Sequence, residues 1–219
     1  MAAGNLNIDL NSNANRELLY MISQFLEHEN LTETARTLER ESGFYFNMRF
    51  FEDLVHNGAF DEAEEYVDGF TDLHENSFST KIYFELRKQK FFETLEDGER
   101  CRALTMLMQE FRDFAPYNRS LCGEAAALLT VDDFRAHQAL AGHGEINEAR
   151  RSAMNDIRRC IQMNPVFHGK LEPPNIESNL QGAIMYGNSE NQNEQQNGVG
   201  GNGDPAPPPN HDISSPGRN

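Results

Sequence analysis

Apolar residues recur at helical spacing near the start of the chain. Two such stripes stand close together: Leu18, Ile22, Phe25 and Leu26 in the first, and Leu31, Ala35 and Leu38 in the second. This spacing puts the side chains of each stripe on one face of a helix. Asn15 precedes the first stripe as a candidate N-cap, and Gly43 follows the second where a left-handed C-terminal cap is favoured. The pattern predicts a helical hairpin.

Helical periodicity continues beyond this hairpin. The further expected helices span about 48–57, 60–67, 78–96, 99–111, 118–129, 131–138 and 145–163. Proline, which interrupts helices, is concentrated afterwards, because eight of the nine prolines lie at or after Pro165. No alternating run is long enough for a sheet, so the expected fold class is all-α.

The two ends of the chain differ from the helical part. Residues 1–14 are polar and rich in asparagine, and we expect them to form a flexible arm. The sequence after residue 187 has no aromatic residue and cannot bury enough surface to offset the entropy of ordering. We therefore expect a disordered tail over 180–219.

Charge and composition exclude several classes of function. The chain has 19 Lys and Arg against 35 Asp and Glu, a formal charge of −16, which disfavours direct binding to nucleic acid or anionic membranes. Its three cysteines form no Cys-x-x-Cys pair, which argues against a zinc site or a disulfide framework. With no catalytic motif either, we expect a protein that is not an enzyme and needs no metal or cofactor.

Several motifs carry a family resemblance. The hairpin reads Leu18-x-x-x-Ile22-x-x-Phe25-Leu26 and then Leu31-x-x-Thr34-Ala35-x-x-Leu38-x-x-Glu41, and it resembles a LisH motif. The block VHNGAFDEA at 55–63 resembles the CTLH motif that follows LisH. The segments ESGFYFNMRFFED at 41–53 and KIYFELRKQK at 81–90 look more narrowly like the plant TOPLESS corepressor family.

This resemblance implies a multi-helix domain with LisH over 15–46, CTLH over 47–100 and CRA-like helices over 101–179. Family members form dimers and tetramers, act in the nucleus, and bind Leu-x-Leu-x-Leu repression motifs of transcription factors and hormone-response regulators. In the family, β-propellers follow the domain, and the residues after Pro165 are too few for one. We therefore expect a homo-oligomer, or a hetero-oligomer with longer relatives.

The helix expected at 78–96 is the candidate peptide-binding element. It carries one stripe at helical spacing: Lys81, Phe84, Lys88, Phe91 and Leu95. Residues 81–90 hold four positive side chains and one negative, a local charge of +3 that suits acidic flanks of a peptide. The resemblance adds positions matching the family groove: Phe114, Leu121, Leu128 and Leu140. It also marks two departures, Ser77 for arginine and Cys160 for leucine.

The expected dimerisation surface is the first stripe, which consists of Leu18, Ile22, Phe25 and Leu26. Two short helices cannot bury that much apolar surface alone.

The N-terminal arm supplies a second hypothesis. Leu6, Ile8 and Leu10 repeat the Leu-x-Ile-x-Leu form of a repression motif. We expect the arm to bind the groove of its own or a neighbouring subunit, or to recruit a full-length corepressor.

Two alternatives stay open. Without the resemblance, Phe84, Phe91, Phe114 and Leu128 are most simply core residues. A scaffold subunit of a LisH and CTLH type ubiquitin-ligase assembly shares the same modules, although the segment at 44–53 favours a corepressor.

Overall fold

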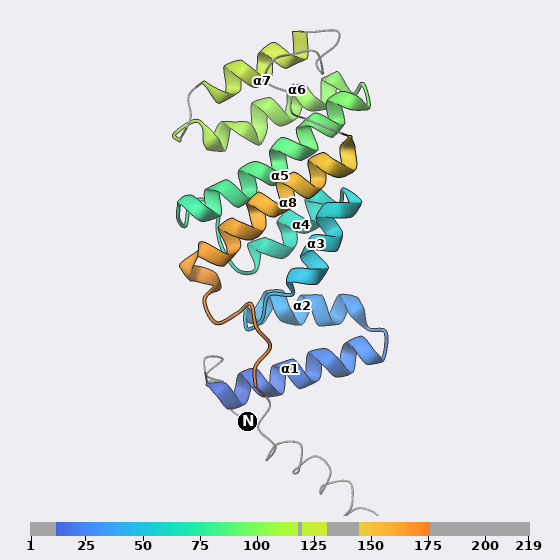
Figure 1. Ribbon diagram of the computed structural model, residues 1–219, viewed down its shortest axis with the longest axis vertical. Coiled ribbons are helices and arrows are strands. Elements are labelled where there is room, and N and C mark those ends of the chain that lie inside the picture. The colour runs from blue at the N-terminus through green and yellow to red at the C-terminus, as the bar shows by residue number, and fades with distance from the viewer. Residues whose placement is uncertain (1–11, 118–119, 131–144, 176–219) are drawn as a thin grey trace, which may run out of the picture. The chain divides into compact units, whose positions relative to one another are not determined.

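A computed structural model describes residues 12–117, 120–130 and 145–175 of the chain, and within these ranges every regular element is helical (Figure 1). The all-α prediction is confirmed. The α-helices are α1 (Asn13–His28), α2 (Thr32–Ser42), α3 (Met48–Asn57), α4 (Phe60–Asp68), α5 (Ser77–Glu96), α6 (Arg100–Gln109), α7 (Leu121–Thr130) and α8 (Ile146–Met163). Two 3-10 turns join them, η1 (Phe111–Phe114) and η4 (Pro165–Phe167).

Helix α1 begins earlier than the sequence pattern suggested. Its N-cap is Ser12, whose hydroxyl accepts a hydrogen bond from the Asn15 N–H at 3.3 Å. The expected cap at Asn15, and an arm extending to residue 14, were therefore wrong, because the Ser12 hydroxyl caps the helix three residues before Asn15. Gly43 does end α2 in the left-handed conformation, with φ of 58°.

Three segments, 1–11, 131–144 and 176–219, lie outside the described residues. They contain most of the expected arm, the expected helix at 131–138 and the expected tail.

The helices pack in a chain of neighbours with α5 in the middle. Helix α1 packs on α2, α2 on α4, and α4 on α5. The long helix α8 returns from far along the sequence to lie against α5 and α3 (Figure 1). On the other side of α5 lie α6 and η1, with α7 packed on both. Helix α5 is thus held from two sides.

An aromatic cluster joins the N-terminal hairpin to the rest of the fold. Its centre is Phe46, fully buried in the loop between α2 and α3. The Phe46 ring lies 4.9–5.3 Å, between centroids, from the rings of Phe51, Tyr66, Phe70 and Phe167. Aromatic side chains bury much surface and favour such tilted pairs, so this cluster fixes the loop against α3, α4 and η4.

A second, separate apolar cluster lies between α5, α6, η1 and α7. Its members are all buried: Phe91, Leu95, Ala103, Met106, Leu107, Phe111, Ala125 and Leu128. The first cluster takes Ile82, Tyr83 and Leu86 from the same helix α5. Only Phe84 on α5 packs against both clusters, and its side chain stays partly exposed.

A buried carboxylate ties α2 to α4. Glu39 is 1 % exposed, and both of its oxygens accept hydrogen bonds from Arg36 Nη1 at 2.7 Å. The Tyr66 hydroxyl donates to Glu39 at 2.7 Å and accepts the backbone N–H of Asn47 at 2.9 Å. Burial raises the pKa of Glu39, while the bonds from Tyr66 and Arg36 lower it. The Tyr66 hydroxyl therefore satisfies two buried groups on different segments.

Replacing Tyr66 by Phe should lower the free energy of unfolding by about 2 kcal/mol, because the Asn47 N–H loses its partner and the buried Glu39 carboxylate loses one of its donors. Urea denaturation measures this loss. Tyr45→Phe is the matched control, since its half-buried ring has no hydroxyl hydrogen bond among the described residues, and its change should stay within about 0.5 kcal/mol. Equal losses in both variants would contradict the assignment.

Candidate functional site

The start of helix α5 is fixed by a polar network. Asn76 caps the helix by accepting hydrogen bonds from the N–H groups of Phe78 and Ser79 at 2.9 and 3.1 Å. Its amide donates to the side-chain oxygen of Asn164, at the end of α8, at 2.9 Å. Asn164 is fully buried and donates in turn to the Ser79 hydroxyl at 2.9 Å. The first turn of α5 is thereby locked against α8.

Two hollows follow α5 from this fixed end. The first, of about 310 Å³, is lined by Ser77, Lys81, Phe84, Phe114 and Tyr117 among others. The second, of about 770 Å³, has Phe84 as a wall residue as well. Because they share Phe84, the hollows adjoin, and we call them together the α5 groove.

The α5 groove gathers most of the residues singled out in the sequence. The first hollow contains Lys81, Phe84 and Phe114, and the second contains Phe84, Lys88 and Leu128. Residues distant in sequence thus meet, since they come from α5, η1 and α7. The side chain of Leu121, and the whole of Leu140, lie outside the described residues.

The aromatic residues of the groove differ in exposure. Phe114 and Phe91 are 2 % and 1 % exposed, so they form its floor and are core residues at the same time. Phe84 packs edge-on against Phe114, with ring centroids 5.5 Å apart, and stays partly open. Farther along the stripe, Leu95 is buried in the second cluster. The predicted stripe therefore lines the surface only in its first half.

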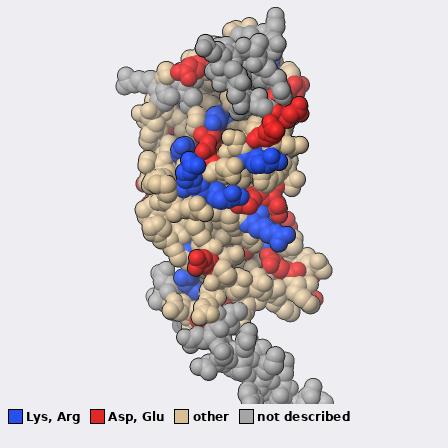
Figure 2. Space-filling view, in the orientation of Figure 1, with Lys and Arg blue, Asp and Glu red and all other residues tan. Residues whose placement is uncertain are grey.

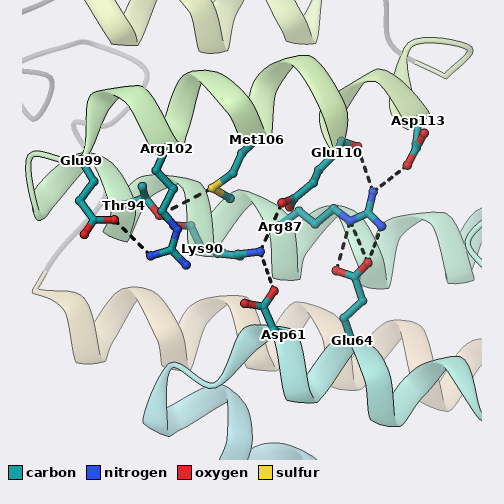
Figure 3. A network of polar contacts seen from close by, with 10 residues as sticks. All are labelled: Asp61, Glu64, Arg87, Lys90, Thr94, Glu99, Arg102, Met106, Glu110 and Asp113. Carbon is teal, nitrogen blue, oxygen red and sulfur yellow. Dashed lines mark hydrogen bonds and ion pairs between the residues drawn. The ribbon is translucent and has the colours of Figure 1, made fainter.

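The local positive charge of residues 81–90 does not face the groove as a whole. Arg87 donates to Glu64 and to Asp113, the latter at 2.9 Å, and Lys90 lies 2.6 Å from Asp61 (Figure 3). These bonds point toward α4 and η1, and they raise the pKa of both cations despite burial. The expectation of a +3 rim was wrong, because two of its four cations are used inside the fold.

Two lysines remain at the groove. Lys88 forms an ion pair with the buried Glu85 and lies 5.4 Å above the centroid of the Phe84 ring. Lys81 is exposed and makes no ion pair within the part of the chain that the structure describes. Lys81 is therefore the groove cation that is available to an acidic ligand.

The structure adds groups that sequence reasoning missed. Tyr117 lines the first hollow, and its hydroxyl lies 3.1 Å from His74 Nδ1, with the two rings stacked 6.2 Å apart. No spacing rule connects residues 43 positions apart. The arginines of α8 were also missed: Lys and Arg gather over the part of the surface where α8 crosses (Figure 2). Of these arginines, Arg150 and Arg158 pair with Glu93 and Glu52.

Among the described residues no group of three His, Cys, Asp or Glu side chains is arranged to hold a metal ion. No helix among them is long and apolar enough to cross a membrane. Cys160 is buried in the first cluster, as expected for a small core residue, and burial raises the pKa of its thiol.

Comparison with known proteins places two family profiles on the chain. The LisH profile matches residues 16–42, and the profile of the TPR1-like, CTLH-containing domain matches residues 47–171. The chain is 43 % identical over 167 residues to Protein TPR3 of Oryza sativa subsp. japonica. It is 41 % identical over the same length to Protein TOPLESS and to Topless-related protein 1, both of Arabidopsis thaliana. Each match covers 76 % of this chain and 15 % of the relative.

Arg87→Met should lower the free energy of unfolding by about 2–3 kcal/mol, because Glu64 and Asp113 lose their shared cation and only Asp113 is well exposed to water. Chemical denaturation measures the change. Arg102→Met is the control: its ion pair with Glu99 joins two exposed side chains on one helix end, so the loss should be within about 0.5 kcal/mol. If Arg87 proves no more important than Arg102, the pairing of α5 with α4 and η1 does not stabilise the fold.

Proposed function

The chain belongs to the family of TPR1-like, CTLH-containing domains preceded by a LisH motif, and we propose that it is a corepressor-type domain that binds Leu-x-Leu-x-Leu peptides in the α5 groove. In this proposal the protein is a non-catalytic adaptor. The observation that carries it is the pair of adjoining hollows, which share Phe84 and have Lys81 at one end.

The groove suits an extended peptide with alternate aliphatic side chains. Side chains on one face of a strand recur about every 6.8 Å, so three leucines need successive apolar hollows rather than a single deep pocket. Phe84 divides two such hollows, and Phe114 and Leu128 supply apolar floor on either side of it. Lys81 is placed to attract an acidic residue beside the motif.

The relatives extend this proposal to the binding partners of the protein and to the cellular compartment in which it acts. The chain spans about 15 % of the length of TOPLESS and its related proteins, so their whole activity is not carried over to it as a finding. We propose that its ligands are repression motifs of transcription factors and hormone-response regulators, and that it acts in the nucleus. Hetero-oligomers with longer TOPLESS-like chains are part of the same proposal.

We further propose that helix α1 forms the oligomer contact. Phe25 is 61 % exposed, Leu18 44 % and Ile22 39 %, while Leu26 is half-buried. Leu31, at the turn into α2, is exposed as well. Large apolar side chains grouped in this way on one helix are typical of a protein interface. Pairing through α1 leaves the α5 groove, on other helices, free for peptide.

The peptide proposal is tested by calorimetric titration of a synthetic Leu-x-Leu-x-Leu peptide and its Leu→Ala version. Phe84→Ala should weaken binding by about 10- to 30-fold, because the wall between the hollows is removed. Lys81→Ala should weaken it about five-fold at low salt and less at high salt. The controls, Met108→Ala and Arg102→Ala, change exposed residues of α6 outside the groove and should leave affinity unchanged.

If the protein does not distinguish the Leu peptide from its Ala version, and neither groove variant matters, the corepressor proposal fails. That result would favour the ubiquitin-ligase scaffold, which needs no such peptide.

Oligomerisation is tested by light scattering coupled to size exclusion. In dilute solution the double variant Ile22→Glu, Phe25→Glu should elute with the mass of one chain, whereas the unaltered protein elutes as a dimer or larger, because two buried carboxylates per helix oppose pairing. Met108→Glu is the matched control on another exposed apolar residue, 67 % exposed on α6, and should keep the assembly. An unaltered protein that runs as a monomer excludes the α1 contact.

A further inference from the structure

The segment before helix α1 carries the pattern that the groove is proposed to bind. Leu6, Ile8 and Leu10 alternate with Asn7 and Asp9. In an extended conformation these three aliphatic side chains lie on one side of the segment and the polar ones on the other. The inference that follows rests on the proposed function of the α5 groove, since it concerns which ligand reaches that groove.

The tether between this motif and the folded domain is short. Only Asn11 separates Leu10 from Ser12, the N-cap of α1. A fully extended chain advances at most about 3.6 Å per residue, so the Cα of Leu10 lies within about 7 Å of that of Ser12, and the Cα of Leu6 within about 22 Å.

The groove of the same chain lies farther away. Helix α1 packs on α2, α2 on α4 and α4 on α5, one layer after another (Figure 1). Packed helix axes are about 8–10 Å apart, so three such steps separate α1 from α5 by about 24–30 Å. The groove also opens toward η1 and α7, which lie beyond α5. The motif therefore cannot fill its own groove, so the groove that it binds belongs to another chain.

The charges of the N-terminal motif and of the α5 groove also favour binding between them. Asp9 is the single charged side chain of residues 1–11, and it lies between the second and third aliphatic positions. With the aliphatic side chains in the hollows, Asp9 is presented at the rim. Lys81 stands at that rim without an ion pair among the described residues. The motif brings one negative charge and no positive charge to an available lysine.

From these observations we propose that Leu6, Ile8 and Leu10 of one chain bind in the α5 groove of a second copy of the chain. The contact joins two different surfaces, so it is heterologous, and each chain both gives a motif and accepts one. Repeated contacts of this kind produce either a growing chain or a closed ring, and two chains that exchange motifs already close such a ring. Because each bound motif occupies a groove, self-assembly and binding of external repression peptides compete.

Two full-length variants test the proposal. The motif variant is Leu6→Ala, Ile8→Ala, Leu10→Ala, and its matched control, Asn7→Ala, Asn11→Ala, changes polar positions of the same segment. Light scattering over a range of micromolar concentrations should show the mass of the unaltered protein and the control rising beyond that of the α1 assembly. The motif variant should keep a constant mass. An external Leu-x-Leu-x-Leu peptide should bind the motif variant several-fold more tightly than the unaltered protein at high protein concentration.

A second measurement separates this proposal from the function on which it rests. A synthetic peptide of residues 1–14 is titrated into the motif variant, and the same variant carrying Phe84→Ala should bind it at least 10-fold more weakly. If the external peptide binds and the residue 1–14 peptide does not, the self-contact is excluded while the proposed function stands. If neither binds, the proposed function itself fails. If the residue 1–14 peptide binds but the mass of the unaltered protein equals that of the motif variant at every concentration, the contact between copies is excluded.

Discussion

Helix α5 is buried on two sides by separate apolar clusters, and the rest of the structure follows from this constraint. Ile82, Tyr83 and Leu86 belong to the cluster shared with α3, α4 and α8, whereas Phe91 and Leu95 belong to the one shared with α6 and α7. A helix held in this way has little free surface left. What remains open is a strip that runs from Ser77 to Phe92, and the two hollows lie along it.

The strong negative charge of the chain explains why several of its cationic side chains form ion pairs within the fold. Arg87 and Arg150 lie in ion pairs that join helices, with Glu64 and Glu93. An internal cation held by carboxylates gains Coulomb energy that is only weakly screened by water, so acidic side chains collect such cations within the fold. Lys81 forms no such ion pair among the described residues, and it lines the groove. A protein with a net charge of −16 can thus still offer a positive contact at one place.

Three surfaces of the chain have separate tasks in the proposed function. The exposed face of α1 joins copies to one another, the α5 groove takes a peptide, and the segment before α1 resembles the peptide that the groove takes. The α1 face and the α5 groove are distant from each other in the fold, because α2 and α4 lie between α1 and α5. Because of this separation, assembly through α1 and peptide binding can occur together. A neighbouring chain and an external peptide compete, because both bind the same α5 groove.

The sequence by itself determined the helices, since a period of 3.6 residues is local, and the expected bounds of α3, α4, α5 and α8 agree with the structure to within one residue. Its helical stripe also named Lys81, Phe84 and Lys88. The family resemblance named Phe114 and Leu128, and all five residues line the groove. Only the tertiary structure decided which cations face that groove, that Tyr117 stands beside it with His74, and that α2 and α4 separate α1 from α5. These properties depend on how helices far apart in sequence pack against each other, and no local spacing encodes that.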